Sequence, residues 1–167
     1  MRILFLGNNW VGLEVLKWLK QEGENVVGLI IHPEERRKYG EEIVGISGLA
    51  SHQIFSGDAL SDPQTMESIR NLEPSIGISA LFGYILTNEF LSSFPSGCLN
   101  LHPAFLPYNR GQYPNVWSII DRTPAGATLH YIDNGIDTGD IVGQRQISVT
   151  PTDTGESLYY RLEQTCV

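Results

Sequence analysis

The sequence predicts an α/β fold: a doubly wound, mostly parallel sheet flanked by helices. Ile3–Leu6 is a short apolar run that stops at a glycine, and apolar residues then recur at helical spacing from Val11 to Leu19. The segment 25–31 comes next in the chain, and it is apolar at every position after Asn25. A strand–helix–strand order of this kind indicates two parallel strands joined by a right-handed crossover.

The rest of the chain continues the alternation of strands and helices. Residues 34–50 form a polar stretch with a weak helical pattern, and a helix start is expected where Ser61 or Asp62 precedes Pro63. The further elements that we expect are strands at 54–55, 75–81, 97–101, 127–132 and 141–147, and helices at 63–71, 87–93, 115–121 and from 152 onward. In such a sheet, ligands bind beyond the carboxyl ends of the strands, so residues that follow strands matter most.

Length and composition limit the class of protein. The chain has 167 residues, of which 41% are hydrophobic and 18% charged, which excludes disorder and predicts one domain over 1–167. No apolar run is long enough for a membrane span, and the opening apolar stretch is too short for a signal peptide. Two cysteines cannot make a disulfide framework, so a reduced, cytoplasmic setting is expected.

The charge pattern disfavours a nucleic-acid partner. The net charge is −8, and six of the eleven basic residues lie within residues 1–38. Beyond that point, five arginines face fourteen carboxylates. Binding to nucleic acid needs a basic patch that neutralises several phosphates, and no such patch is evident.

The turn Gly7–Gly12 follows a strand and opens a helix, as a dinucleotide-binding loop would. Its pattern is G-x-x-x-x-G rather than G-x-G-x-x-G, and the Lys-Ser/Thr of a phosphate-binding P-loop is missing. We therefore expect a tight turn with some ligand contact, and the pattern speaks against a nicotinamide-dependent oxidoreductase.

Asn100 and His102 are the sharpest candidates for chemistry. They lie two residues apart on a predicted strand, so they share a face, and a buried polar pair is costly unless it is used. An amide can stabilise an oxyanion, an imidazole can move a proton, and a nearby acid can orient the imidazole, which together suit acyl transfer. For either residue alone, a satisfied core group is the alternative.

The acids come from the segment 133–140, Asp-Asn-Gly-Ile-Asp-Thr-Gly-Asp. Its spacing does not match a calcium loop, and a hairpin rich in turn residues is the plain alternative. His102, His130 and Asp137 could in principle bind a metal, but three ligands from distant segments and no i, i+4 histidine pair argue against one. We expect no metal.

Three motifs together resemble the formyltransferase family that uses 10-formyltetrahydrofolate: Asn100–Pro103, the loop Phe105–Gly111 and Gly135–Asp140. The resemblance covers nearly the whole chain and implies a Rossmann-like catalytic domain. It implies that Asn100, His102 and Asp137 are the catalytic set. It further implies that the folate is held by Leu81, Phe82, Gly83, Tyr84, Ile85 and Leu86 together with Asp133 and Ile136.

Within that family, Gln112–Ser118 and Asp121–Pro124 look most like the sugar N-formyltransferases. This resemblance implies a nucleotide-linked amino sugar as the small-molecule acceptor, such as a dTDP-amino-dideoxyhexose, and a role in lipopolysaccharide or O-antigen biosynthesis. We expect the acceptor to be contacted by Asn8, Asn9, Trp10, Arg110, Gln112, Tyr113 and Asn115. Relatives of this kind continue further at the C-terminus, so a truncated chain and a homodimer are both considered.

Other readings stay open at this stage. A methionyl-tRNA formyltransferase-like enzyme or a transferase for another small amine would use the same chemistry. A domain that binds folate or a nucleotide without turnover is the alternative from another class. The presence of all three residues Asn100, His102 and Asp137 favours an enzyme, because binding alone does not need them.

Overall fold

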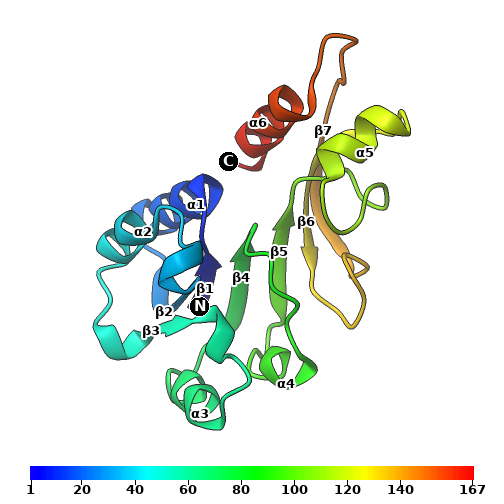
Figure 1. The fold of residues 1–167 in the computed structure, drawn as a ribbon. Helices are drawn as coiled ribbons and strands as arrows, with labels where there is room; N and C mark the ends of the chain where they lie inside the picture. The colour runs from blue at the N-terminus through cyan, green and yellow to red at the C-terminus, as the bar shows by residue number, and fades with distance from the viewer. The chain divides into compact units, whose positions relative to one another are not determined.

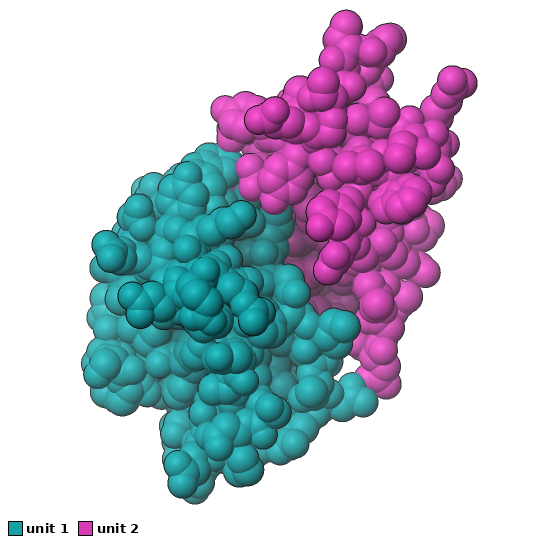
Figure 2. Space-filling model, viewed as in Figure 1, with its two compact units in different colours: residues 1–99 teal, residues 100–167 magenta.

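The computed structural model describes all residues from 1 to 167, and the chain divides into two compact units. Unit 1 comprises residues 1–99 and unit 2 residues 100–167, coloured separately in Figure 2. Each unit is described by itself. The expectation of one domain over 1–167 stays a prediction.

Unit 1 is an open, parallel α/β unit. Its strands β1 (Arg2–Gly7), β2 (Asn25–Ile31), β3 (Ile54–Ser56) and β4 (Ile76–Ala80) are arranged in the order β3-β2-β1-β4. The pairings β1–β2, β1–β4 and β2–β3 are all parallel. The helices are α1 (Trp10–Gln21), α2 (Gly40–Ser47), α3 (Pro63–Asn71) and α4 (Asn88–Leu91), with 3-10 turns at Glu34–Arg36, Ser51–Gln53 and Gly57–Ala59.

Helices cover both faces of these strands. Figure 1 shows α1 and α2 together on one side of the unit 1 strands and α3 on the other. On the first face, Leu13, Leu16 and Leu19 of α1 pack with Ile43 of α2 against Phe5 of β1 in one buried cluster. This burial follows from the helical spacing of the apolar residues in α1, and it stabilises the unit chiefly through removal of apolar surface from water.

The second face depends on a glycine in the middle of β2. A Cβ built on Gly28 would lie 2.6 Å from Leu4 Cδ1 and 2.7 Å from Leu72 Cδ1, closer than real Cβ atoms come. Leu72 is the C-cap of α3, so the missing side chain lets the end of this helix approach the sheet. The helix itself begins as predicted, with Asp62 as N-cap and Pro63 at its first position.

Unit 2 holds the end of β5 (Cys98–His102), the antiparallel pair β6 (Ala125–Tyr131) and β7 (Ile141–Ile147), and the helices α5 (Pro114–Ile120) and α6 (Gly155–Cys166). Strand order here is β5-β6-β7. Leu158 and Leu162 of α6 pack on Ala125 of β6. Thr154 caps α6, because its hydroxyl accepts from the backbone N–H of Ser157 and the Ser157 hydroxyl accepts from the backbone N–H of Thr154.

The predicted fold class is confirmed: an open α/β sheet, mostly parallel, with helices. The polar stretch 34–50 contains a defined helix, α2, rather than a weak one, because Ile43 is fully buried and anchors it to the core. Three short 3-10 turns were outside the predicted elements, since local patterns of three residues carry little periodic signal. None of the helices has both the length and the apolar character that crossing a membrane requires.

Candidate active site

Strand β5 presents two predicted site residues at its carboxyl end. Asn100 and His102 are two apart and therefore lie on the same face, and the chain leaves the strand at Pro103 immediately afterwards. His102 is buried, whereas Asn100 is half-buried. Both belong to unit 2, as do all the residues that contact them in the paragraphs below.

The ring of His102 is held at its Nε2 atom by two acceptors. Nε2 lies 3.3 Å from the backbone carbonyl oxygen of Asn109 and 3.4 Å from Oδ2 of Asp137. Because both partners can only accept, Nε2 carries a proton, which leaves Nδ1 to accept one. Burial lowers the pKa of His102 below its ordinary value, although the Asp137 charge and the Asn109 carbonyl act in the opposite direction. The imidazole is therefore neutral at pH 7 and able to act as a base.

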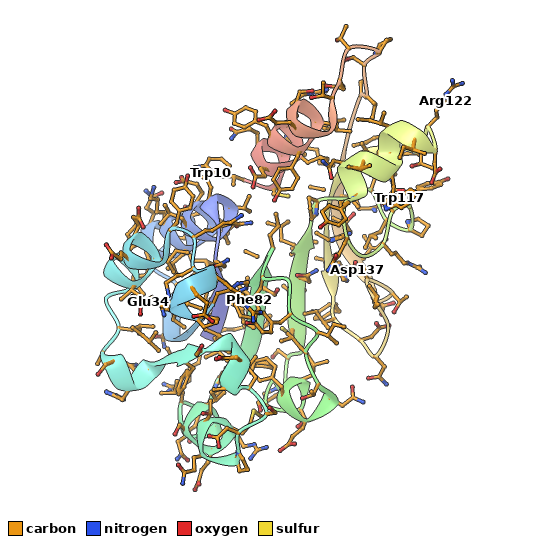
Figure 3. The ribbon with its side chains drawn as sticks, in the orientation of Figure 1. Trp10, Glu34, Phe82, Trp117, Arg122 and Asp137 are labelled. Carbon is orange, nitrogen blue, oxygen red and sulfur yellow. The ribbon has the colours of Figure 1, made fainter.

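Asp137 lies in the loop between β6 and β7 and is labelled in Figure 3. Its backbone is left-handed, with φ of 51°, a conformation that aspartate tolerates better than most residues. Oδ2 accepts the backbone N–H of Gly111 at 2.8 Å, and Oδ1 lies 3.5 Å from Nε2 of His130. Burial raises the pKa of Asp137, but the two imidazoles and the Gly111 N–H outweigh it and hold the pKa below its usual value. The carboxylate is ionised at neutral pH.

His130, on β6, is the second imidazole beside Asp137. Its Nδ1 lies 2.8 Å from the carbonyl oxygen of Tyr131, and its Nε2 lies 3.3 Å from the side-chain nitrogen of Asn100. The ring is almost completely buried. Nε2 of His130 thus lies within reach of both the amide of Asn100 and the carboxylate of Asp137.

A buried hydroxyl fixes the loop that follows β5. Thr128 of β6 is fully buried; its Oγ1 donates to the Ala104 carbonyl at 2.6 Å and accepts the Leu106 N–H at 3.1 Å. The amide of Gln144 on β7 donates to the same hydroxyl at 3.0 Å and to the Leu106 carbonyl at 2.7 Å. This network holds the loop against the β6–β7 hairpin.

Asn109 fixes the far part of the same loop. Its side-chain amide donates to the hydroxyls of Ser118 at 2.7 Å and Thr123 at 2.8 Å. These bonds set the position of its own backbone carbonyl, which is the acceptor for His102. Two residues later, Gly111 supplies the N–H that binds Asp137. The loop therefore orients both members of the His102–Asp137 pair.

In unit 1, the segment Leu81–Leu86 forms an irregular loop after β4. Leu81 and Gly83 have φ values of 49° and 78°. Nε2 of His32 lies 2.6 Å from the carbonyl oxygen of Phe82, and the His32 ring stands edge-on to the rings of Phe82 and Tyr84. A cavity of ≈ 230 Å³ lies along this loop, lined in part by Tyr84, Ile85 and Leu86. The segment predicted to bind folate is thus a loop that His32 contacts and that borders a cavity.

The two asparagines in the turn before α1 make hydrogen bonds within the protein. Asn9 is the N-cap of α1, and its Oδ1 accepts the Gly12 N–H at 3.0 Å. Asn8 is buried and ties down the segment after β2: its side-chain nitrogen donates to the Arg36 carbonyl, and its oxygen accepts the Lys38 N–H. Trp10 begins the helix and is half-buried (Figure 3).

The remaining residues predicted to contact the acceptor are of two kinds: three are exposed, and one is buried and hydrogen-bonded within the protein. Arg110, Gln112 and Tyr113 are exposed, and Arg110 takes part in none of the ion pairs of the chain. Asn115 is buried, and its amide nitrogen donates to the Gly155 carbonyl at 2.6 Å, which ties α5 to α6. This contact supports the fold, so Asn115 has a structural use that the sequence did not suggest.

Asp133 and Ile136 lie in the same loop as Asp137. Oδ1 of Asp133 accepts from the Thr138 hydroxyl at 2.6 Å and from the Gly135 N–H at 3.0 Å, and these bonds lower its pKa. Ile136 is exposed, and so is Trp117 of α5, at 47%. Trp117 is exposed because α5 buries the face that carries Pro114, Asn115 and Ser118.

Sequence reasoning did not assign His130, Thr128, Asn109 or Gly111 to the catalytic machinery. His130 was considered only as a metal ligand, and the structure contains no group of three or more His, Cys, Asp or Glu side chains placed to hold a metal ion. One signal could have found two of them: Thr128 and His130 are polar residues at i and i+2 on a strand that is otherwise apolar.

Comparison with known proteins agrees with this arrangement. The family model described as "Formyl transferase" matches residues 1–166. Methionyl-tRNA formyltransferases from Geobacter sulfurreducens and Geotalea daltonii are 31% and 34% identical to the chain, over 98% and 97% of its length. The chain spans about half the length of these curated relatives, 54% of each.

Solved structures show the same fold. A protein from Mycobacterium tuberculosis, assigned provisionally as a sugar N-formyltransferase, is 26% identical with a TM-score of 0.73, over 99% of this chain and 62% of that one. A phosphoribosylglycinamide formyltransferase from Anaplasma phagocytophilum is 24% identical with a TM-score of 0.83, over 99% of this chain and 81% of that one. The second likeness concerns the fold alone. Since the family model covers all but the last residue, the chain belongs to the formyl transferase family.

Proposed function

We propose that this chain transfers a formyl group from 10-formyltetrahydrofolate to the primary amine of a nucleotide-linked amino sugar. The observation that carries the proposal is the cluster Asn100, His102 and Asp137 in unit 2. It combines an amide donor, a neutral imidazole and an ionised carboxylate within one small group of contacts. This is the set that acyl transfer to an amine requires.

The proposed reaction runs through a tetrahedral intermediate. The lone pair of the amine forms a bond to the formyl carbon, and the carbonyl electrons move to the oxygen. The Asn100 amide N–H donates to that developing negative charge. Nδ1 of His102 accepts the proton that the amine loses, while Asp137 faces the opposite side of the ring and stabilises its cationic form. When the bond from the formyl carbon to the folate nitrogen breaks, this nitrogen takes up the proton.

The donor is assigned from the family and from the loop Leu81–Leu86. The backbone of this loop is fixed by His32 and lies beside a cavity, which suits a ring held by backbone groups. We propose that Leu81, Phe82, Gly83, Tyr84, Ile85 and Leu86 hold the folate. That Asp133 and Ile136 contact it as well stays a prediction from the family resemblance. The turn at Asn8–Trp10 stays a predicted contact of the acceptor.

A small anionic acceptor is favoured by the charge around the cluster. Unit 2 contains four arginines and seven carboxylates, which suits a small molecule met by one cation better than a polyanion met by many. Arg110 is exposed and unpaired, one residue before the Gly111 N–H that binds Asp137. We propose that it meets the diphosphate of the nucleotide sugar. Gln112 and Tyr113, exposed beside it, are proposed sugar contacts.

Methionyl-tRNA is the second candidate acceptor, because the curated relatives carry that name at 31–34% identity. One assay separates the two. The chain is incubated with 10-formyltetrahydrofolate and either amino-sugar nucleotides, glycinamide ribonucleotide or charged initiator tRNA, and tetrahydrofolate release is followed. Turnover with an amino-sugar nucleotide alone supports the proposal. Turnover with the tRNA alone would show that the proposed acceptor is wrong, while the proposed formyl-transfer chemistry would stand.

A further inference from the structure

We infer that His130 is a positioning residue for Asn100: Nε2 of its imidazole accepts one amide N–H of Asn100 and so fixes which end of that amide faces the reacting oxygen. The inference deepens the proposed function and rests on it for the role of Asn100. It assigns His130 no contact with substrate.

The tautomer of His130 follows from a backbone contact. Nδ1 lies 2.8 Å from the carbonyl oxygen of Tyr131, and a carbonyl oxygen can only accept a hydrogen bond. Nδ1 therefore carries the proton. In the neutral ring this leaves a lone pair on Nε2, which points away from Tyr131 and needs a donor because His130 is only 1% exposed.

Two groups lie within reach of Nε2, and only one of them can donate. The side-chain nitrogen of Asn100 is 3.3 Å away, and Oδ1 of Asp137 is 3.5 Å away. The carboxylate of Asp137 accepts only, so it pairs with Nε2 only when that atom carries a proton, and a hydrogen bond of this kind helps to hold the pKa of Asp137 low. When Nδ1 carries the proton and Nε2 has a lone pair, the amide of Asn100, which is also the nearer group, is the partner that can donate. The other charged or titratable neighbours are His102, whose ring centroid is 6.4 Å from that of His130, and Asp133, whose carboxylate interacts electrostatically with His130.

The consequence concerns the orientation of the Asn100 amide. A primary amide has a donating end and an accepting end of nearly equal size, and rotation about its last bond exchanges them. With one N–H held by His130, the nitrogen end stays on this side, and the second N–H has a fixed direction. A flipped amide would present its carbonyl oxygen and repel the oxyanion that it is meant to stabilise. Preorganisation of this kind is what gives such donors their effect on rate.

Two substitutions separate this role from simple packing. His130→Gln keeps an acceptor near the position of Nε2, whereas His130→Phe keeps a planar ring and removes the acceptor. For His130→Phe we expect kcat to fall about 10–100-fold, part of what loss of an oxyanion donor costs, with KM changed by less than about threefold. His130→Gln should recover most of kcat. Thermal unfolding of both variants shows whether either loses its fold.

A second readout needs no turnover. In ¹⁵N-labelled wild-type protein, NMR reports the tautomer of each histidine and the two amide protons of Asn100, with exposed His52 as an internal reference. We expect the ring of His130 to carry a proton on Nδ1 and a lone pair on Nε2. One Asn100 amide proton should shift in His130→Phe and keep its position in His130→Gln.

The inference is overturned by a wild-type His130 that carries its proton on Nε2, or by Asn100 amide resonances that do not respond to His130→Phe. It is also overturned if His130→Phe raises KM and leaves kcat unchanged, or if both variants turn over like wild type. If the wild-type chain transfers formyl groups to no acceptor, the proposed function fails instead, and the NMR result still decides whether His130 orients Asn100.

Discussion

The backbone N–H of Gly111 donates to Oδ2 of Asp137 at 2.8 Å and so joins the loop after β5 to the loop between β6 and β7. The same carboxylate oxygen faces Nε2 of His102. Asp137 is therefore fixed from the backbone on one side while it orients an imidazole on the other. A carboxylate held in this way keeps its direction without relying on the ring that it serves.

Loss of the oxyanion donor is the most direct test of Asn100. Asn100→Ala removes the amide, and we expect kcat to fall about 10²–10³-fold, the usual effect of deleting one such donor. Asn100→Asp has the same shape but accepts only and adds negative charge, so it should be at least as slow. Steady-state kinetics and circular dichroism of both variants check this. Turnover near the wild-type rate in either would remove Asn100 from the mechanism.

The pH dependence follows from the direction of the His102 pKa. The neutral ring is the active base, and burial lowers its pKa below the ordinary 6.5, so the neutral form persists to lower pH. We expect kcat/KM to be level around neutral pH and to fall on the acid side with a midpoint below 6.5. The profile is measured at saturating donor. A midpoint above 6.5, or the same acid limb in His102→Gln, would contradict the assignment.

The Arg110 side chain gives a test of acceptor binding. Arg110→Ala should raise the KM of the acceptor about 10–100-fold, the effect of losing one charge-assisted contact, and leave the KM of the folate donor nearly unchanged. The acceptor KM of Arg110→Lys should fall between those of wild type and Arg110→Ala, because lysine retains the charge but lacks the planar guanidinium group. Equal effects on both substrates would instead indicate that Arg110 supports the loop.

The buried hydroxyl of Thr128 tests what holds the site in shape. Thr128→Val preserves the shape but strips the partner from the Ala104 carbonyl and the Leu106 N–H. Leaving a buried polar group unpaired costs about 1–3 kcal/mol, so the free energy of unfolding should fall by at least that much. Thr128→Ser keeps the hydroxyl and should cost less. Urea denaturation gives the free energy of unfolding of each variant, and the comparison requires that the dependence of this free energy on urea concentration has the same slope in both. Equal free energies of unfolding for Thr128→Val and Thr128→Ser would contradict the role of the hydroxyl network.

The two thiols give a simple check on burial. Burial raises the pKa of Cys98 to about 12 and, with Glu163 nearby, that of Cys166 to about 12. The thiolate is the reactive form, so both thiols should react slowly at pH 8 in the native protein and quickly in denaturant. A thiol reagent followed by absorbance measures both rates. Fast labelling of native Cys98, which is only 2% exposed, would mean that β5 opens readily.

The sequence allowed a correct prediction of most elements because strands and helices in this chain have clear periodicity. Helix α3 has its cap and its proline where local rules place them, and β2 is apolar without interruption from Val26 to Ile31. Helix α2 was underestimated, since its burial depends on a single anchor, Ile43, that packs against distant strands. Tertiary packing of this kind leaves little mark on local composition.

The candidate site was accessible to sequence reasoning only in part. The spacing of Asn100 and His102 placed both on one face of a strand, which the structure contains as β5. The contact between Asn100 and His130 spans thirty residues and depends on how β6 is placed, so no local pattern encodes it. Asn115 illustrates the converse: it stands in a motif that suggested substrate contact, yet its amide holds the start of α6.

The formyl-transfer assay with a panel of acceptors tests the central claim most directly, with His102→Ala measured alongside wild type. The account predicts release of tetrahydrofolate with an amino-sugar nucleotide and its loss in His102→Ala, while the variant unfolds at the same temperature as wild type. Folate binding without turnover on any acceptor, or equal turnover in His102→Ala, would contradict the claim that the cluster Asn100, His102 and Asp137 catalyses the transfer.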